Sequence, residues 1–368
     1  MAKSSLASAE RSWLGQAFDF ADQRLGLAEL WQLAAKKTVP QHAHAFWYYL
    51  GGITLFFFAI QCLTGVLLLV YYRPGPEAYD SVRRITYDVD FGWLIRSAHS
   101  WSANLMIFAL LVHLFSVYLM KAYRRPREFG WWTGLALLGL STTFGFSGYL
   151  LPMDELAYFA TKVGLEIPQS LPVVGAVVVD LIRGGPEVNE ETIQRFFALH
   201  VVILPAVFVP LLAVHLWLVQ RHGNAVPPRE GAQPEAERRS IRFFPDFAMK
   251  DLAMWLIALN VLGLCACVFP WGLEPQADPL AAAPVGIHPE WYFMVPFQLL
   301  KVLGVWLPGA VGEFAGMALL GGAALVVALI PLYDTREAPP HRARVATWIG
   351  LALLAGAIVL TVWGYAAL

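Results

Sequence analysis

The chain has 368 residues, of which 58% are hydrophobic and only 14% charged, with a formal net charge of −1. Soluble globular domains carry charge on about a quarter of their residues, so this composition excludes an ordinary soluble domain. The nearly neutral charge balance also gives no indication of nucleic-acid binding.

Apolar runs recur along the chain at the length of about twenty residues that a helix needs to cross a bilayer. The sequence therefore predicts an all-α membrane protein with seven transmembrane helices, arranged as a four-helix bundle followed by three further helices. The expected spans are 46–71, 93–120, 130–151, 196–219, 252–271, 314–333 and 346–366.

The segment before the first span lacks a long apolar run, so no cleavable signal peptide is expected. Residues 17–37 are typical of an amphipathic helix lying on the membrane surface. The N-terminal segment and the loops after spans two, four and six hold 18 of the 26 basic residues. The positive-inside rule then predicts a cytoplasmic N-terminus, an outer C-terminus and, in a bacterium, the cytoplasmic membrane.

Two long connections fall on the predicted outer side, at 152–195 and 272–313. They contain "SLPVVGAVVVDLI" and "HPEWYFMVPFQLLKVLGVW", which are apolar but interrupted by proline, and which we expect to form helices near the outer surface. A charged, proline-containing stretch separates the two blocks of spans. The predicted organisation is an N-terminal segment (1–45), a four-helix core (46–221), a cytoplasmic linker (222–250) and a three-helix domain (251–368).

Four of the nine histidines lie well inside predicted spans, and they form two pairs. His99 and His113 are fourteen residues apart on the second span, and His200 and His215 are fifteen apart on the fourth. At 100° per residue, these separations return to within about 40° and 60° of the starting direction, so each helix presents both histidines on one face. The rise separates the members of each pair by about 21–22 Å.

Both helices run from outside to inside, so one histidine of each lies at the outer level and one at the inner level. Two facing imidazoles can fill both axial positions of a haem, which then carries electrons because no ligand position remains open. The pattern therefore predicts two stacked haems. Hydrogen-bonded histidines at helix interfaces, or a proton relay, are the alternatives.

Several other residues fit a haem pocket. Gly51 and Gly65 are fourteen residues apart on the first span, as are Gly134 and Gly148 on the third, and small residues would admit a wide, flat cofactor. Close packing between membrane helices explains such glycines equally well. Arg96, one turn before His99, could pair with a haem propionate, or it could reach to water as an interfacial arginine.

These histidines, together with "YYLGGITL", "FGWLIRSAHSWSA", "FGFSGYLLP", "RFFALH" and "HPEWYF", resemble cytochrome b of the Rieske/cytochrome bc complexes. The resemblance covers nearly the whole chain from about Ala17. The fifteen-residue histidine spacing, "GFSGYLLPMDELAYFATK" and three spans after the linker are similar to the chloroplast-type branch, here with cytochrome b fused to its subunit IV.

The resemblance implies two non-covalent b-type haems, with His99 and His200 on the outer iron and His113 and His215 on the inner iron. It also implies an outer quinol-oxidation pocket, bordered by Pro289, Glu290, Trp291, Tyr292 and Tyr149. A quinol loses protons as it loses electrons, and the Glu290 carboxylate is suited to accept one of them. A surface glutamate that caps a helix is the alternative for Glu290.

The resemblance places an inner quinone-reduction pocket around "FFPDFAMKDL", with Lys250 and Asp251 beside the quinone. An acidic residue also suits a helix N-terminus, which is the competing explanation for Asp251. Arg221 and His222 end the fourth span near the same level and are further candidates. Tyr49 stands where the chloroplast-type branch carries a cysteine that tethers an extra c-type haem, which argues against a covalent haem here.

The function implied is quinol oxidation at the outer face, with one electron passing to a Rieske iron–sulfur protein and on to a c-type cytochrome or similar carrier. The other electron crosses to an inner quinone, with proton translocation, in a homodimeric multi-subunit complex. One alternative is a dihaem membrane anchor of a dehydrogenase or hydrogenase, which would not explain "PEWY". A transporter without redox function is another, and it would be colourless.

Overall fold

The computed structural model describes residues 13–26, 28, 29, 32, 36–169, 174–231, 234, 238–284 and 286–367. Long helices follow the apolar runs of the sequence. They are α3 (Tyr49–Leu69), α5 (Gly92–Leu119), α6 (Glu128–Tyr149), α9 (Glu190–Ala198) continued by a π turn (Leu199–Ile203) into α10 (Leu204–His222), α12 (Ala248–Val268), α14 (Ala310–Tyr333) and α15 (Pro340–Ala366).

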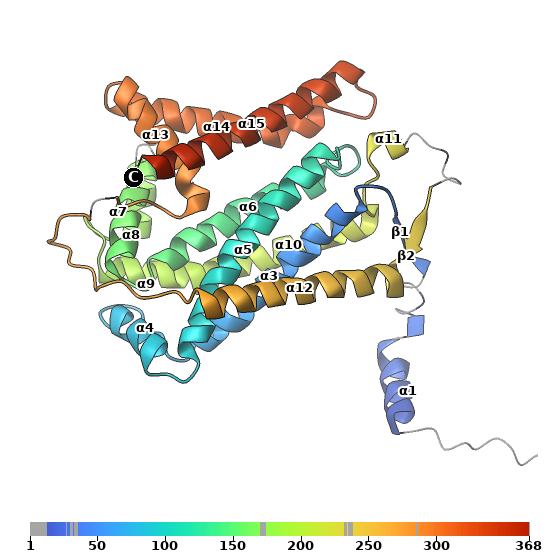
Figure 1. Ribbon diagram of the computed structural model, residues 1–368, viewed down its shortest axis with the longest axis horizontal. Helices are drawn as coiled ribbons and strands as arrows, with labels where there is room; N and C mark the ends of the chain where they lie inside the picture. Colours follow the sequence, from blue (N-terminus) through green and yellow to red (C-terminus); the bar gives the residue numbers. More distant parts are fainter. Residues whose placement is uncertain are drawn as a thin grey trace, which may run out of the picture.

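These helices lie side by side in two groups (Figure 1). Helix α3 packs along α5, α6 packs along α10, and α12 lies against α5 and α3. Helices α14 and α15 form the second group together with α13 (Met294–Trp306). Helix α12, the first span after the linker, thus lies with the four helices of the predicted core, and α14 and α15 pack with α13. The predicted division at residue 250 into a four-helix core and a three-helix domain stays a prediction.

Among the described residues, six helices are long and apolar enough to cross a membrane. The predicted third span, α6, has sufficient length at 22 residues but lower hydropathy, because it contains five glycines and five serine or threonine residues. Helices also extend past the predicted limits: the fourth begins at Glu190 and the last at Pro340. These first turns are polar, so they lie outside the apolar runs that set the prediction.

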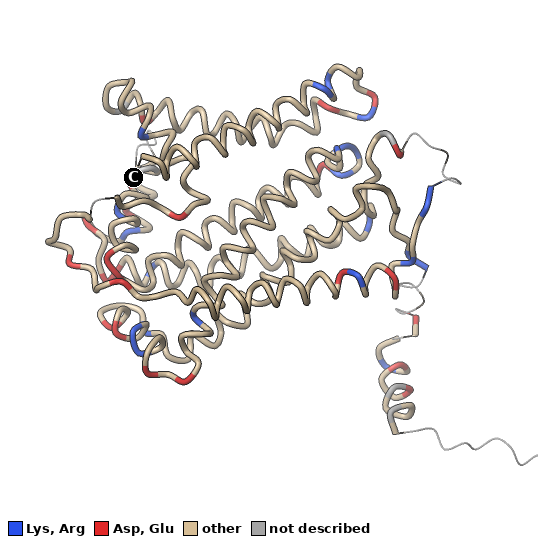
Figure 2. The backbone as a smooth tube through the Cα atoms, viewed as in Figure 1, with Lys and Arg blue, Asp and Glu red and all other residues tan. Residues whose placement is uncertain are grey.

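Charged residues gather at the two ends of the helices and leave their middle portions almost free of charge (Figure 2). This distribution is what a bilayer requires, because an unpaired charge in the hydrocarbon layer is costly. The chain is an integral membrane protein, and the part of it that the structure describes contains six apolar helices.

One end of the bundle, which is the predicted outer end, is covered by short helices. They are α4 (Ala78–Tyr87), α7 (Glu155–Gln169) and α8 (Gly175–Arg183), together with the first turns of α9. Leu150, Tyr158, Ile193 and Phe196 form the buried cluster at this end. Helices α7, α8 and α13 occupy the two long connections for which the sequence predicted surface helices, although residues 170–173 lie outside the described residues.

The opposite end holds a feature that the sequence did not predict. Strand β1 (Thr38–Pro40) of the N-terminal segment pairs antiparallel with β2 (Ser240–Arg242) of the linker. The linker also contains α11 (Pro228–Gly231) and a π turn (Phe243–Phe247) before α12. Helix α1 (Trp13–Leu25) covers only the first part of the range 17–37 that was expected to form a surface helix, and it ends before Gly26, which has a positive φ of 62°. Residues 27, 30, 31 and 33–35 of that range lie outside the described residues.

Helices α14 and α15 are fastened to the core by polar contacts at the inner end. Pro331 has no N–H, so the carbonyl of Val327 lacks its helical donor and accepts the Trp131 indole N–H of α6 at 3.0 Å. The Trp132 indole donates to the carbonyl of Ala328 at 2.8 Å.

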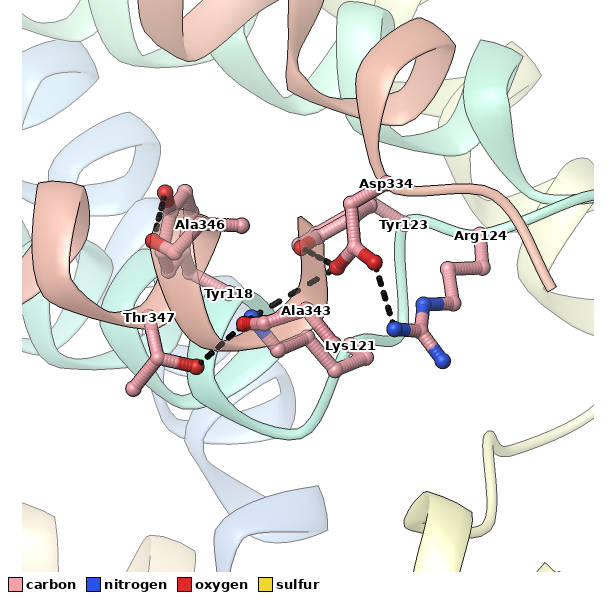
Figure 3. A network of polar contacts seen from close by, with 8 residues as sticks. All are labelled: Tyr118, Lys121, Tyr123, Arg124, Asp334, Ala343, Ala346 and Thr347. Atoms are coloured by element: carbon pink, nitrogen blue, oxygen red, sulfur yellow. Dashed lines mark hydrogen bonds and ion pairs between the residues drawn. The ribbon is translucent and has the colours of Figure 1, made fainter. Parts of the chain in front are cut away.

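The loop before α15 carries Asp334, which is fully buried. Its carboxylate accepts the Tyr123 hydroxyl at 2.6 Å and pairs with Arg124 at 2.5 Å and Lys121 at 3.5 Å (Figure 3). A buried carboxylate is costly unless it is paired and hydrogen-bonded, and these three partners come from the loop that follows α5. The network therefore joins the two groups of helices.

Candidate functional site

The four intramembrane histidines lie on α5 and on the helix formed by α9, the π turn and α10. The fifteen-residue spacing has a structural cause: His200 lies in the π turn, which holds one residue more than an α-helical turn. Pro205 follows directly and cannot donate to the carbonyl of Val201, which interrupts the α-helical ladder there. The one additional residue in the π turn offsets the one additional residue between His200 and His215. These two histidines therefore share a helix face, as His99 and His113 do.

The outer histidines face each other across the bundle. The ring centres of His99 and His200 are 6.4 Å apart, with the ring planes at 69°. With bonds of about 2 Å to a metal, and a ring nitrogen roughly 1 Å from the ring centre, one metal between two imidazoles holds the centres about 6 Å apart. His113 and His215 are close enough to interact electrostatically. The predicted pairing by level is therefore present in the structure.

Hydroxyl groups orient three of the four imidazole rings. Each hydroxyl lies near the ring Nδ1 and also donates to a backbone carbonyl three or four residues earlier, at 2.7–3.2 Å. The hydroxyl oxygen then accepts from Nδ1–H, which leaves the Nε2 lone pair free for a metal. The pairs are Thr64 with His99 at 2.8 Å, Thr133 with His215 at 3.0 Å and Ser147 with His200 at 3.0 Å.

The four glycines identified in the sequence lie directly against these imidazoles. A Cβ on any of them would meet the ring Cε1 atom of one histidine, so the glycines allow the rings to approach the neighbouring helix. The distances would be 3.3 Å from Gly51 to His113, 3.4 Å from Gly65 to His99, 3.3 Å from Gly134 to His215 and 2.7 Å from Gly148 to His200. The donor set and the space around it fit two bis-histidine haems.

Arg96 does not point freely into the haem region. Its Nη1 donates to the carbonyl of Trp271 at 3.0 Å and its Nη2 to that of Gly272 at 2.9 Å. These bonds tie α5 to the chain that leaves α12. Contact with a haem propionate stays a prediction, and it would have to use the remaining N–H groups of the guanidinium.

A cavity of about 410 Å³ lies near the outer histidines. Glu290, Tyr292, Pro289 and Tyr149, four of the five residues predicted for quinol oxidation, line it. The cavity has mostly apolar walls from α6, α7, α13 and α14, and Phe146, Val163, Phe297, Met317 and Leu320 are among the residues that form them. Its size and apolar lining are typical of a site for a small organic ligand.

Helix α6 separates this cavity from the outer histidine pair. Ser147 and Gly148 contact the His200 ring, whereas Gly145 and Tyr149 line the cavity. Position 145 must be a glycine for the "PEWY" loop to lie where it does, because a Cβ there would lie 2.5 Å from the Tyr292 hydroxyl oxygen. One helix thus has a face on the histidine and a face on the cavity.

Trp291 does not line the cavity, unlike its neighbours in the "PEWY" loop. Its indole N–H donates to Oδ1 of Asn104 on α5 at 2.8 Å, and its ring lies 6.5 Å from that of Phe108. Asn104 in turn donates to the carbonyl of Ser100 at 3.0 Å. Trp291 therefore anchors the loop on α5 while Glu290 and Tyr292 face the cavity.

Burial changes the acidity of the loop side chains. It raises the pKa of the Glu290 carboxyl, although the nearby His288 opposes the shift. Burial, reinforced by the charge of Glu290, also raises the pKa of the Tyr292 phenol. A carboxylate with a raised pKa is a stronger base than an exposed one, which suits a proton acceptor.

The predicted inner-site residues are only partly brought together. Asp251 has a buried Oδ1 without a hydrogen-bond partner among the described residues, and a Cβ on Gly52 would lie 2.5 Å from it. Gly52 follows the glycine that contacts His113, so Asp251 lies near the inner histidine level. Tyr49 stacks on Phe247 with ring centres 4.8 Å apart.

The remaining inner candidates lie nearer the surface. Lys250 and Arg221 are exposed, and the Arg221 guanidinium stacks 5.8 Å from the centre of the Trp217 ring. The carbonyl of His222 accepts from Arg127 at 3.0 Å. Roles for these three residues in quinone reduction stay predictions.

Some functional residues were not recognised in the sequence. Thr64, Thr133 and Ser147 each directly precede a glycine that faces a histidine, so the recurring hydroxyl–glycine pair was a usable signal. The sequence also held a signal for Asn104, because an amide in the middle of an apolar span needs a hydrogen-bond partner. Gly145 had no distinctive signal, since its role depends on where the Tyr292 loop lies.

Comparison with known proteins agrees with this arrangement. Residues 34–223 match the family Cytochrome b/b6/petB, and residues 276–367 match Cytochrome b(C-terminal)/b6/petD. The chain is 46% identical over 332 residues to a cytochrome bc complex cytochrome b subunit of Chlorobaculum thiosulfatiphilum, a match that spans 90% of this chain and 76% of that one. It is 40% identical over 215 residues, 58% of its length, to the whole of a cytochrome b6 of Synechococcus elongatus.

A chain in the solved structure titled "Hyperthermophilic respiratory Complex III" superposes with a TM-score of 0.78 at 26% identity, over 94% of this chain and 98% of that one. The resemblance found in the sequence is thereby confirmed. The chain belongs to the cytochrome b family, that of the cytochrome b subunits of bc-type quinol oxidoreductases, and combines a cytochrome b/b6 region with a petD-like C-terminal region.

Proposed function

We propose that this chain oxidises quinol in the outer cavity and passes electrons across the membrane to a quinone-reduction site at the inner end. The observation that carries the proposal is the double contact of α6, which has Ser147 and Gly148 on His200 and Gly145 and Tyr149 on the cavity. A substrate in the cavity would be one helix away from the outer pair of histidines.

Two b-type haems would be held by His99 with His200 and by His113 with His215, and when bound they would supply a one-electron path between the two membrane faces. Helix α6 contacts His215 near its start and His200 near its end. It therefore accompanies α10 through the same depth, which supports α6 as a seventh transmembrane helix despite its lower hydropathy.

The chain's own contribution at the outer site is to bind quinol and to accept a proton. Apolar side chains such as Phe146 and Phe297 would pack on the quinol ring, and they exclude water from its hydroxyl groups. Oxidation of quinol to quinone releases two electrons and two protons. The Glu290 carboxylate takes one proton, and its raised pKa increases the driving force for that transfer.

At the inner end, Asp251 would supply a proton to quinone as it is reduced. Its carboxylate oxygen is buried beside Gly52, close to the helix face that contacts His113. The exposed Lys250 and the end of α10, with Arg221 and His222, would connect this carboxyl with the aqueous phase. Proton uptake inside and release outside would make the reaction electrogenic.

The proposed partners follow from the two electrons of quinol. One would go to a Rieske iron–sulfur protein and then to a c-type cytochrome or similar carrier, and the other would go inward through this chain. The chain would act in a homodimeric, multi-subunit bc-type complex, with a cytoplasmic N-terminus and the C-terminus outside. Tyr49, stacked on Phe247, offers no thiol for a covalent third haem.

The test is quinol-driven reduction of the b haems in the purified complex, followed by absorbance. Wild type should bind two b haems, His113→Ala should lose the inner one, and Glu290→Gln should reduce the haems more slowly while it still binds both. Glu313→Gln is the matched control, because Glu313 is an exposed carboxylate at the start of α14.

Three results would contradict the proposal in different ways. A colourless wild-type protein would indicate a transporter. A haem-containing complex without a Rieske protein would indicate a dihaem anchor. Full activity in Glu290→Gln would remove that residue from the reaction.

A further inference from the structure

One of the four imidazoles lacks the contact that the other three share. In three cases the residue just before the facing glycine is Thr64, Thr133 or Ser147, and its hydroxyl meets the ring Nδ1. The fourth glycine is preceded by Leu50. Correspondingly, Nδ1 of His113 is buried and has no hydrogen-bond partner among the described residues.

The missing bond is caused by the side chain at position 50 and not by a different placement of the ring. A Cβ on Gly51 would lie 3.7 Å from Nδ1 of His113, within the 3.2–4.0 Å range of the other three glycines and their histidines. Leu50 itself is buried at the start of α3. The nearest hydroxyl along α5, that of Ser116, donates to the backbone carbonyl of His113.

Such a hydrogen bond changes the donor strength of a metal-bound imidazole. When Nδ1–H donates to an oxygen, the ring becomes more basic and gives more electron density to the metal. Hydrogen bonding around the ligands is one of the means by which a protein sets the potential of a haem. A more electron-rich iron is harder to reduce, so each such bond lowers the potential.

We propose that Leu50 raises the potential of the inner haem, because it leaves His113 without an acceptor for its Nδ1–H among the described residues. The outer pair, His99 and His200, has two hydroxyl acceptors, whereas the inner pair has one, at His215. The inner haem is therefore easier to reduce than it would be with a hydroxyl-bearing residue at position 50. This inference rests on the proposed function, because it requires haem between each pair.

The experiment is a spectroscopic redox titration of the purified complex, in which two b-haem waves are resolved. Leu50→Thr supplies the missing hydroxyl and should move one wave to lower potential. Thr133→Val removes the hydroxyl beside the other inner ligand, His215, and leaves only the backbone carbonyl of Gly130 near that ring, so it should move that same wave to higher potential. Thr64→Val should raise the other wave. Leu63→Thr is the control: it adds a hydroxyl to an exposed position of α3 and should move neither wave.

The outcomes separate this inference from the proposed function. If wild type contains no b haem, the proposed function fails before any potential is measured. If both haems are present and Leu50→Thr leaves both waves in place, or raises one, the role of Leu50 is refuted. If Leu50→Thr does not retain haem, the two threonine variants decide, and unchanged potentials in both would overturn the inference.

Discussion

Replacement of Gly148 by alanine should selectively weaken haem binding at the outer pair of histidines. The added Cβ would lie 2.7 Å from Cε1 and 3.2 Å from Nδ1 of His200, and the first distance is shorter than a carbon–carbon contact allows. Overpacking of this kind costs about 1–3 kcal/mol. If the cost falls on the ligand ring, haem affinity at the outer pair drops about 5- to 140-fold, at about 1.4 kcal/mol per factor of ten.

The assay is haem content together with a redox titration of the reduced-minus-oxidised spectrum, in which one of the two waves should lose amplitude. Gly139→Ala is the control on the same helix, because a Cβ there meets nothing within 4 Å. Gly65→Ala should be nearly silent, since its Cβ would lie at an ordinary 3.4 Å from Cε1 of His99. Full retention of both haems in Gly148→Ala, or a greater loss in Gly65→Ala, would refute the reasoning.

Burial raises the pKa of Glu290 above its ordinary 4.5, and only the ionised form accepts a proton, so quinol oxidation should fall as the pH drops through that raised value. Glu290→Gln should abolish this acid limb, and its persistence would assign the limb to another group. Asp334→Asn should lower the free energy of unfolding by about 3–5 kcal/mol in thermal denaturation, because Lys121, which is buried, and Arg124, which is partly buried, lose their charged partner. Asp80→Asn, in an exposed pair, should cost at most about 1 kcal/mol. Asn104→Leu should raise KM for quinol with both haems retained. Asn260→Leu, which changes an exposed asparagine with the same i−4 bond, should not raise it; equal effects would contradict the anchoring role of Asn104.

The helices and the histidine pairs could be predicted because both depend on local periodicity. An apolar run of about twenty residues forms a helix in a bilayer whatever its neighbours are, since its backbone polar groups have no other partner. Likewise, the spacing of His99 and His113 fixes their common face through the geometry of a single helix. The glycine pairs on the first and third spans could also be found from their fourteen-residue spacing. The sequence did not show which histidine each glycine contacts.

Other features depend on contacts between segments far apart in the chain. Trp291 was expected in the cavity wall, and its position on Asn104 follows from the way the loop lies between α5 and α6. The pairing of β1 with β2 joins residues about two hundred positions apart, and strands of three residues give almost no periodic signal. The partners of Asp334 could not be inferred from the sequence, because a short charged loop is normally expected to be exposed to solvent.

The sequence by itself determined that this protein spans a membrane with helices and carries two levels of paired histidines, because hydropathy and helical repeat are properties of one segment at a time. The tertiary structure alone decided which hydroxyl faces which imidazole, that no described hydroxyl meets the ring of His113, and that α6 stands between His200 and the cavity. These depend on how helices rotate and pack against one another, and packing is set by all the side chains at an interface together.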